Sequence, residues 1–317
     1  MINLSLVLHF ISLFYFAMHE TQYSGRGVCV SGVAGSGCDV LVPFNERKPL
    51  VDIERSIIKK YRKNIWSKFL KAIRDFKLVE EGDRIAVAVS GGKDSLLMAK
   101  LFQELQKHGE VNIELEFVCM DPGYHENIRQ LMLDNCGYLD IPLKVYDSGI
   151  FRVIDNIAKD YPCYMCAKMR RGALYNKAQE LGCNKLALGH HFNDVIETTM
   201  LNILYTGSFK TMLPKLHSSN FKGLELIRPM YYIDEEFIER FTQSSGIWPL
   251  NCACMVAAEK TGNKRYEIKD MIKELKGKIP GVDWNILKAT ENVNLEAILG
   301  WQKGDKHHSY LDFYDEE

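Results

Sequence analysis

The sequence of 317 residues lacks a strong net charge, a recognisable targeting leader and an even set of cysteines, and each absence excludes a class of protein. A formal net charge of −1 excludes binding of nucleic acid through the overall charge, so a basic surface must be local. The first 18 residues are almost wholly apolar, yet no positive charge precedes them, and they are shorter than the roughly 20 residues that cross a bilayer. We therefore expect no stable membrane association.

The next stretch, residues 19–48, is rich in Gly and Ser. Within it, GVAGSG at 32–37 lacks a preceding strand and has the wrong spacing for a dinucleotide-binding loop. We expect residues 1–48 to be a poorly structured or extraneous extension outside the fold.

Nine cysteines are present, an odd number with two local clusters. This pattern argues against a disulfide framework and favours thiol or metal chemistry in a reducing compartment, so we expect a cytoplasmic protein. Cys119, Cys136 and Cys183 each stand alone on an apolar element, and we interpret them as buried core residues.

Residues 52–76 carry apolar side chains at helical spacing, which predicts an amphipathic helix within an N-terminal segment at 49–80. The apolar face is formed by Ile53, Ile57, Tyr61, Ile65, Phe69 and Ile73. The other face is basic, because the stretch from Arg47 to Lys77 holds eleven Lys and Arg against three acids. Such an excess indicates a surface for a polyanion, with an ordinary solvated helix face as the alternative.

Short apolar strands then alternate with helices, which predicts an α/β fold with a parallel sheet covered by helices on both faces. The expected strands are 84–90, 113–120, 143–147, 185–190 and 224–233, and the expected helices are 94–107, 124–137, 149–159, 167–181 and 193–205. We assign residues 81–277 to this domain and residues 278–317 to a helical C-terminal tail. Ligands of such sheets bind at the carboxyl ends of strands, where Ser90, Asp121 and the Gly189-His190 pair fall.

The loop Ser90-Gly91-Gly92-Lys93-Asp94-Ser95 follows the first expected strand and opens a helix. Backbone N–H groups at such a helix start, left accessible by the glycines, favour an anion such as phosphate. The loop differs from the Walker pattern, which requires Gly where Val87 stands and Ser or Thr where Asp94 stands. A strand-to-helix turn with a chance lysine is the structural alternative.

A second polar cluster, residues 189–194 with the sequence GHHFND, follows the fourth expected strand and favours a contribution to the same ligand site. Adjacent histidines beside an aspartate suggest zinc, but the spacing His-x-x-x-His is absent. A helix N-cap at Asn193 or Asp194, together with a packed histidine, is the alternative.

The clustered cysteines are a C-x-x-C at Cys163 and Cys166, just before an expected helix, and a late pair at Cys252 and Cys254. A zinc ribbon is disfavoured because the late pair has C-x-C spacing, and a zinc deaminase because the required His-x-Glu is missing. The third interpretation is an iron–sulfur cluster held by three thiolates, which leaves one iron of a four-iron cube open for sulfide or substrate.

Taken in order, SGGKDS, the C-x-x-C followed by Arg170-Arg171-Gly172, ALGHHFND, IRPM and the late cysteines resemble the tRNA 2-thiocytidine synthetase family of PP-loop ATP pyrophosphatases. The resemblance covers roughly residues 50–277 and implies an ATP-dependent tRNA sulfurtransferase. Such an enzyme adenylates a tRNA pyrimidine, in this family cytidine 32, with release of pyrophosphate, and then transfers sulfur to C2. The implied cofactors are ATP, Mg²⁺ and a [4Fe–4S] cluster. The implied partners are tRNA, a sulfur donor (a cysteine desulfurase or sulfide) and a second copy of the chain.

The same resemblance implies roles for residues of the nucleotide site. The 90–95 loop would hold the leaving pyrophosphate, with Lys93 and Asp94 as catalytic residues and Asp94 helping to hold Mg²⁺. Asp194 is the second catalytic and metal candidate, because Asn193 stands where many relatives have the first Asp. The nucleotide-binding set comprises Ser90, Gly91, Gly92, Lys93, Asp94, Ser95, Asp121, Gly189 and His190.

For the cluster, the resemblance implies Cys163 and Cys166 as ligands, with Cys254 preferred as the third and Cys252 second. The alternatives within the superfamily are a lysidine synthetase-like ligase, which needs no cluster, and a small-molecule sulfur transferase. A zinc-stapled RNA-binding protein without catalytic activity is the more distant alternative.

Overall fold

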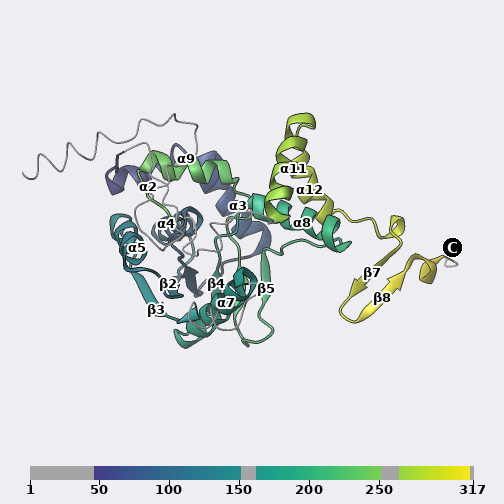
Figure 1. Cartoon of the computed structure of the whole chain (residues 1–317), viewed down its shortest axis with the longest axis horizontal. Coiled ribbons are helices and arrows are strands. Elements are labelled where there is room, and N and C mark those ends of the chain that lie inside the picture. Colours follow the sequence, from purple (N-terminus) through teal and green to yellow (C-terminus); the bar gives the residue numbers. More distant parts are fainter. Residues whose placement is uncertain (1–45, 151–161, 251–263, 315–317) are drawn as a thin grey trace, which may run out of the picture.

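The protein, represented by a computed structural model that describes residues 46–150, 162–250 and 264–314, is built around a six-stranded sheet in the order β3-β2-β1-β4-β6-β5 (Figure 1). The strands are β1 (Arg84–Ala88), β2 (Glu114–Asp121), β3 (Leu143–Asp147), β4 (Lys185–Ala187), β5 (Lys215–His217) and β6 (Glu225–Ile227). Neighbouring strands are parallel except for the β5–β6 pair, which confirms the predicted α/β class.

The last part of the sheet differs from the prediction. Of the expected strand at 224–233, only Glu225–Ile227 pairs as β6. Pro229 explains the early end, because proline lacks the N–H that a sheet requires and restricts the residue before it. The antiparallel edge strand β5 is too short, at three residues, to show an apolar periodicity in the sequence.

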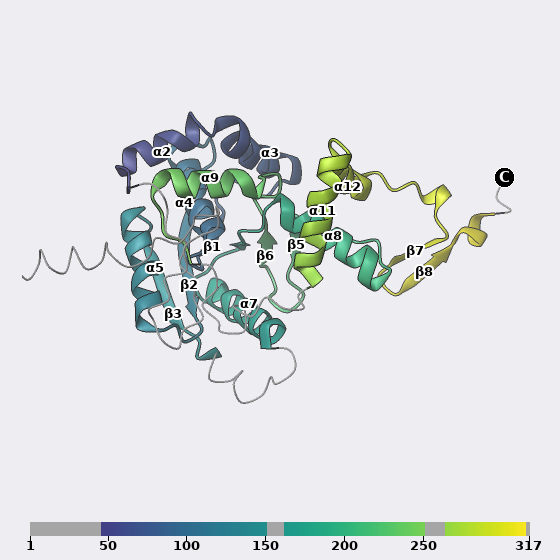
Figure 2. The same ribbon diagram turned by 45° about the horizontal axis from the view of Figure 1, so that its top comes forward.

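Helices cover both faces of the sheet, as predicted, because the side chains of β1 alternate between two cores. Ile85 and Val87 belong to the larger core, which includes α4 (Lys93–His108). Ala86 belongs to a second core beneath α7 (Pro162–Glu180). Figure 2 shows α5 (Glu126–Tyr138) beside the β3 edge and α9 (Glu235–Ser245) above α4. The expected helix at 149–159 falls almost wholly on residues outside the described part of the chain.

The N-terminal segment is helical but divided into α2 (Leu50–Ile58), a π-helical turn η1 (Arg62–Trp66) and α3 (Ser67–Phe76). The carbonyl of Tyr61 accepts from the N–H groups of both Ile65 and Trp66, which widens the helix at this point. The predicted apolar face is confirmed, since Ile53, Ile57, Tyr61, Ile65 and Phe69 are buried and Ile73 is partly buried.

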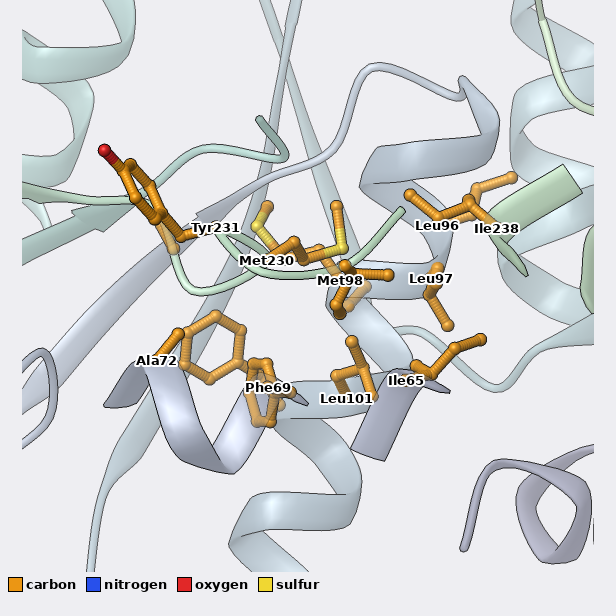
Figure 3. Close-up of a cluster of buried hydrophobic side chains, with 14 of the residues drawn as sticks. Ile65, Phe69, Ala72, Leu96, Leu97, Met98, Leu101, Met230, Tyr231 and Ile238 are labelled. Atoms are coloured by element: carbon orange, nitrogen blue, oxygen red, sulfur yellow. The ribbon is translucent and has the colours of Figure 1, made fainter. Parts of the chain in front are cut away.

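The buried side chains of these helices belong to the larger core. Figure 3 shows Phe69 and Ile65 of this segment on either side of Leu101 of α4. Phe69 meets Phe102 edge to face at 5.6 Å between ring centroids. Burial of a large apolar side chain contributes roughly 1.5–3 kcal/mol, so this packing fixes α4, and with it the loop at the start of α4, against the sheet.

The C-terminal region starts with α11 (Lys264–Lys278) and α12 (Val282–Glu291), which pack against α8 (Phe192–Thr206). Of the tail predicted to be helical at 278–317, α12 is helical and the part after it is not. A 3₁₀ turn, η2 (Leu295–Ala297), leads to a hairpin of β7 (Gly300–Lys303) and β8 (Lys306–Ser309), which projects from the body (Figure 1) and is followed by η3 (Tyr310–Phe313). The two-residue Gly304-Asp305 connection accounts for the difference, because Gly-Asp is a hairpin turn signal.

Within the three described ranges, none of the helices combines the length and the apolar character needed to span a bilayer. The apolar run at residues 1–18 lies outside these ranges.

Candidate active site

The phosphate loop joins β1 to α4, with Gly92 as the N-cap of the helix. Gly91 has a φ of +82°, and a Cβ there would lie 2.7 Å from Leu250 Cδ1, so its conformation and its neighbour both require glycine. The Ser90 N–H donates to the Ser95 hydroxyl at 3.1 Å, which closes the loop onto the first turn of α4. The loop therefore presents its backbone at a helix start, the arrangement that favours an anion.

The second nucleotide motif, the polar cluster at residues 189–194, lies directly against this loop. A Cβ on Gly189 would lie 3.3 Å from backbone atoms of Asp94 and Ser95, so glycine permits the close approach. The chain runs from β1 to β2 on one side, whereas β4 pairs with β1 on the other. The two motifs thus meet at the switch point of the sheet, where ligands of open α/β sheets bind.

Asp194 is held by a capping box at the start of α8. His191, not Asn193 or Asp194, is the N-cap: its N–H donates to Asp194 Oδ2 at 2.8 Å, and the Asp194 N–H donates to its Nδ1 at 3.4 Å. Arg265 of α11 binds the other carboxylate oxygen of Asp194. Asn193 instead accepts from the backbone N–H of Glu235 at 3.0 Å, which joins this turn to α9.

Lys93 lies between two carboxylates. Its Nζ is 3.0 Å from Asp94 Oδ1 and 3.1 Å from Glu235 Oε1, and Lys269 of α11 lies 2.6 Å from the other oxygen of Glu235. Burial alone would lower the pKa of Lys93, but the two carboxylates outweigh it and hold the pKa above its ordinary value. Burial would raise the pKa of Glu235, yet Lys93, Lys269 and His191 lower it to about 2. These groups are therefore charged at neutral pH.

A cavity of about 400 Å³ opens beside the two motifs. Its polar lining is Ser90, Gly92, Asp94, Ser95, Gly189, His190 and Asp194, together with Arg170 and Arg171. Its apolar lining is Ala88, Val89, Val118, Met120, Leu174 and Leu188. One wall thus suits phosphates and another suits a flat apolar group such as a nucleobase.

The C-x-x-C lies on the helix that supplies the two arginines. α7 begins at Pro162, so Cys163 and Cys166 stand in its first two turns and not before the helix, as the sequence pattern suggests. Proline is common at the first helical position, where it gives up no hydrogen bond. Cys166 precedes Arg170 by one turn, about 6 Å along the axis. The side chains of both cysteines lie outside the described part of the structure.

The late cysteines, Cys252 and Cys254, also lie outside the described residues, but both flanks of their segment reach the site. On one flank, the Leu250 N–H donates to the Gly91 carbonyl at 2.9 Å. On the other, Arg265 near the start of α11 binds Asp194.

Asp121 lies at the carboxyl end of β2, where its carboxylate organises a neighbouring turn. It accepts from the N–H groups of Gly123 at 2.8 Å and Tyr124 at 2.7 Å. The Tyr124 hydroxyl in turn accepts from Arg170 at 2.8 Å. Asp121 therefore supports an arginine of the cavity wall, while its predicted contact with the nucleotide remains a prediction.

The isolated cysteines Cys119, Cys136 and Cys183 are buried and free, as predicted. Burial raises the pKa of Cys119 and of Cys136 to about 12 and that of Cys183 to about 11. These thiols are therefore protonated and act as apolar core residues.

Among the residues with described side chains, no three His, Cys, Asp or Glu gather as a group that could hold a metal ion. Three site residues, Glu235, Arg265 and Lys269, have no signal in the local sequence pattern. They belong to α9 and α11, and only the tertiary fold brings them to the loop.

Three comparisons bear on this geometry. Residues 55–248 match the PP-loop domain family. A tRNA-cytidine(32) 2-sulfurtransferase of Pelobacter propionicus is 38% identical over 234 residues, which are 73% of this chain and 86% of that protein. One of Klebsiella pneumoniae is 35% identical over 255 residues, 79% of this chain and 80% of that protein. The structure is similar to that of the U34-tRNA thiolase NcsA of Methanococcus maripaludis, solved with its [4Fe-4S] cluster, with a TM-score of 0.58 at 24% identity. The superposition covers 75% of this chain and 80% of that chain and supports the fold.

Proposed function

The chain belongs to the PP-loop family of tRNA-cytidine(32) 2-sulfurtransferases, and on this premise we propose that it uses ATP to replace the C2 oxygen of a tRNA cytidine with sulfur. One observation carries the proposal for this chain: the phosphate loop and the helix that bears the C-x-x-C line a single cavity. A lysidine synthetase-like ligase would need the phosphate loop but not the C-x-x-C helix.

ATP fits the chemistry of the cavity. The glycines of the loop keep side chains away from the helix start, and Lys93 supplies a charge for the departing pyrophosphate. The tRNA base would attack the α-phosphate through its O2 atom, and pyrophosphate would leave into the loop. This step converts a base oxygen, a very poor leaving group, into part of AMP, which is a good one. Arg170 and Arg171 would neutralise phosphate charge from the α7 wall as it develops.

Mg²⁺ fits the carboxylates at the same place. We infer that Asp94 and Asp194 hold it, because both line the cavity and carboxylate oxygens are its usual protein ligands. Both acids are paired with cations, Asp94 with Lys93 and Asp194 with Arg265, so these cations would move to phosphate oxygens when the metal and ATP bind.

For the cluster, we propose Cys163 and Cys166 as ligands, with Cys254 as the third and Cys252 as the alternative. Three thiolates are the donor set that a [4Fe–4S] cluster with one open iron requires. The bound cluster would supply the sulfur-transfer site. In support of the late cysteines, Leu250, two residues before Cys252 in the sequence, is fixed at the loop by its N–H bond to the Gly91 carbonyl.

The tRNA substrate would lie along the exposed basic face of α2 and η1. Lys59, Lys60, Arg62 and Lys63 are exposed there, whereas Lys68 and Lys71 nearby are paired with Asp234 and Asp75. We further infer a cytoplasmic homodimer supplied with sulfur by a cysteine desulfurase or free sulfide. In this proposal residues 81–277 form the catalytic domain, residues 49–80 and 278–317 are additions to it, and residues 1–48 take no part.

The experiment is to purify the protein without oxygen and incubate it with ATP, Mg²⁺, sulfide and unmodified tRNA. We expect absorbance near 400 nm, AMP and pyrophosphate in equal amounts, and 2-thiocytidine in the digested tRNA. Cys163→Ala should abolish thiolation and leave ATP binding intact, with buried Cys183→Ala as the matched control. A colourless, zinc-loaded protein, or thiolation retained by Cys163→Ala, would contradict the cluster assignment. Lysidine or a thiolated small molecule as product would favour the alternatives.

A further inference from the structure

Arg228, directly after β6, is the buried cation behind His190 and takes no part in the mechanism above. It is 7% exposed, its Nη1 donates to the carbonyl of Leu213, and its backbone N–H donates to the carbonyl of Pro214 at 2.9 Å. Its Nε donates to His190 Nδ1 at 3.3 Å. Arg228 does not line the cavity, whereas His190 does.

This contact determines the state of the histidine. A guanidinium can only donate hydrogen bonds, so His190 Nδ1 must accept with a lone pair. The neutral ring then carries its proton on Nε2, the one remaining polar atom of the side chain. Burial and the nearby Arg171 lower the pKa of Arg228 to about 10, so Arg228 stays charged near neutral pH.

The surroundings also keep the ring neutral. Burial lowers the pKa of His190 to about 4. The Asp194 carboxylate opposes this shift, and three cations support it, namely Arg228, Arg171 and Arg265. At neutral pH the His190 ring is therefore uncharged and has one N–H group, not the two of an imidazolium.

We propose that Arg228 is a positioning residue that holds His190 as the Nε2-protonated tautomer, so that the ring gives a fixed N–H donor to a phosphate oxygen in the cavity. A phosphate oxygen can only accept. The other tautomer would place a lone pair of Nε2 against it, which turns attraction into repulsion. Gly189 brings this turn against the backbone of Asp94 and Ser95, so the donor lies beside the phosphate loop. The choice of phosphate as its partner rests on the proposed function.

The tautomer can be measured in the resting protein, without any substrate. Long-range ¹H–¹⁵N correlation spectra of ¹⁵N-histidine-labelled protein distinguish the two tautomers, and loss of the signal in His190→Gln assigns it. We expect a bare Nδ1 and a protonated Nε2 at pH 7.5. In Arg228→Met we expect a mixture of tautomers. Arg171→Met, which removes a nearby charge but no bond to the ring, should leave the tautomer unchanged. A wild-type ring protonated on Nδ1, or an unchanged tautomer in Arg228→Met, would overturn the proposal.

A second pair of variants leaves Arg228 in place and is informative even if Arg228→Met does not fold. The amide nitrogen of Gln can occupy the position of Nε2, whereas that of Asn corresponds to Nδ1. We expect His190→Gln to retain ATP affinity and pyrophosphate release at least about tenfold better than His190→Asn, the effect of one hydrogen bond to a charged group. Equal activity of the two variants would contradict a donor at Nε2. Neither the tautomer nor ATP affinity and pyrophosphate release depends on sulfur transfer. If the tautomer is confirmed but no thiolation occurs, the proposed function is wrong and the role of Arg228 still holds.

Discussion

Gly91→Ala tests whether the phosphate loop is as crowded as the structure indicates, and the chain offers a matched control. Gly91 and Gly82 have nearly equal positive φ angles, +82° and +79°. A Cβ at Gly91 would meet Leu250 Cδ1 at 2.7 Å and Met132 Cγ at 3.2 Å, whereas a Cβ at Gly82 would meet nothing within 4 Å. The two substitutions therefore share the conformational cost and differ in the steric one.

The expected losses of unfolding free energy follow from the conformational cost and the steric cost. A left-handed conformation costs a residue other than glycine roughly 1–2 kcal/mol, so Gly82→Ala should lose about that much unfolding free energy. Forcing a methyl group into packed surroundings costs roughly 1–3 kcal/mol more, so Gly91→Ala should lose about 2–5 kcal/mol in total. If the shifted loop also loses one N–H bond to a charged phosphate, ATP affinity should fall roughly 10- to 150-fold.

Urea unfolding followed by circular dichroism would measure the stabilities, and calorimetric titration would measure ATP affinity. Gly82→Ala should bind ATP as the wild type does. Adding Leu250→Ala to Gly91→Ala removes the clashing methyl group and should recover part of the lost ATP affinity. Equal stability losses in Gly91→Ala and Gly82→Ala, with ATP binding unchanged in both, would refute the packing of Leu250 on the loop.

Three further predictions concern charged groups. Arg265→Met should free the Asp194 carboxylate and tighten Mg²⁺ binding by about tenfold when no ATP is present, as measured by calorimetric titration, whereas Arg240→Met, which removes an exposed ion pair, should not. Equal Mg²⁺ affinity of the wild type and Arg265→Met would contradict the exchange. The pKa of Glu235 is lowered to about 2, so its contribution to stability is complete above its ordinary pKa of 4.5 and is lost as the pH falls toward 2. Glu235→Gln should therefore flatten the fall in melting temperature between pH 4.5 and pH 2, and an unchanged dependence of melting temperature on pH would contradict the ion pair. Lys60→Glu with Lys63→Glu should weaken tRNA binding and reduce its salt dependence in filter binding without changing ATP affinity; tRNA affinity that does not depend on salt would exclude the basic face.

The parts of the fold that the sequence predicts are those encoded locally. Strand periodicity, glycines at strand ends and the amphipathic N-terminal segment each depend on residues close in the chain, so the sheet and the two nucleotide motifs could be predicted. The start of α7 could have been predicted as well, because Pro162 is a signal for a first helical position. The Gly304-Asp305 turn likewise marks the C-terminal hairpin.

The charged partners of the site could not be predicted in this way. Glu235 is 142 residues from Lys93, and Arg265 is 71 residues from Asp194, so no local periodicity connects them. The sequence pattern also could not predict His191 as the N-cap of α8, since Ser, Thr, Asp and Asn are the usual residues at that position. Long-range ion pairs depend on which helices pack together, and that is decided by the core.

These ion pairs have a consequence for how the nucleotide binds. Lys93 and Arg265 already have carboxylate partners, so ATP alone would draw them away from Asp94 and Asp194 and leave these partly buried carboxylates without those cations. Mg²⁺ alone would take these two carboxylates from the cations and leave Lys93 paired only with Glu235 and Arg265 only with Glu197. If both arrive together, as in the proposed function, the carboxylates would bind the metal and the cations would bind the phosphates, so no charge would lose a partner. ATP and Mg²⁺ should therefore bind with positive coupling, and the Arg265–Asp194 and Lys93–Asp94 pairs would contribute to that coupling.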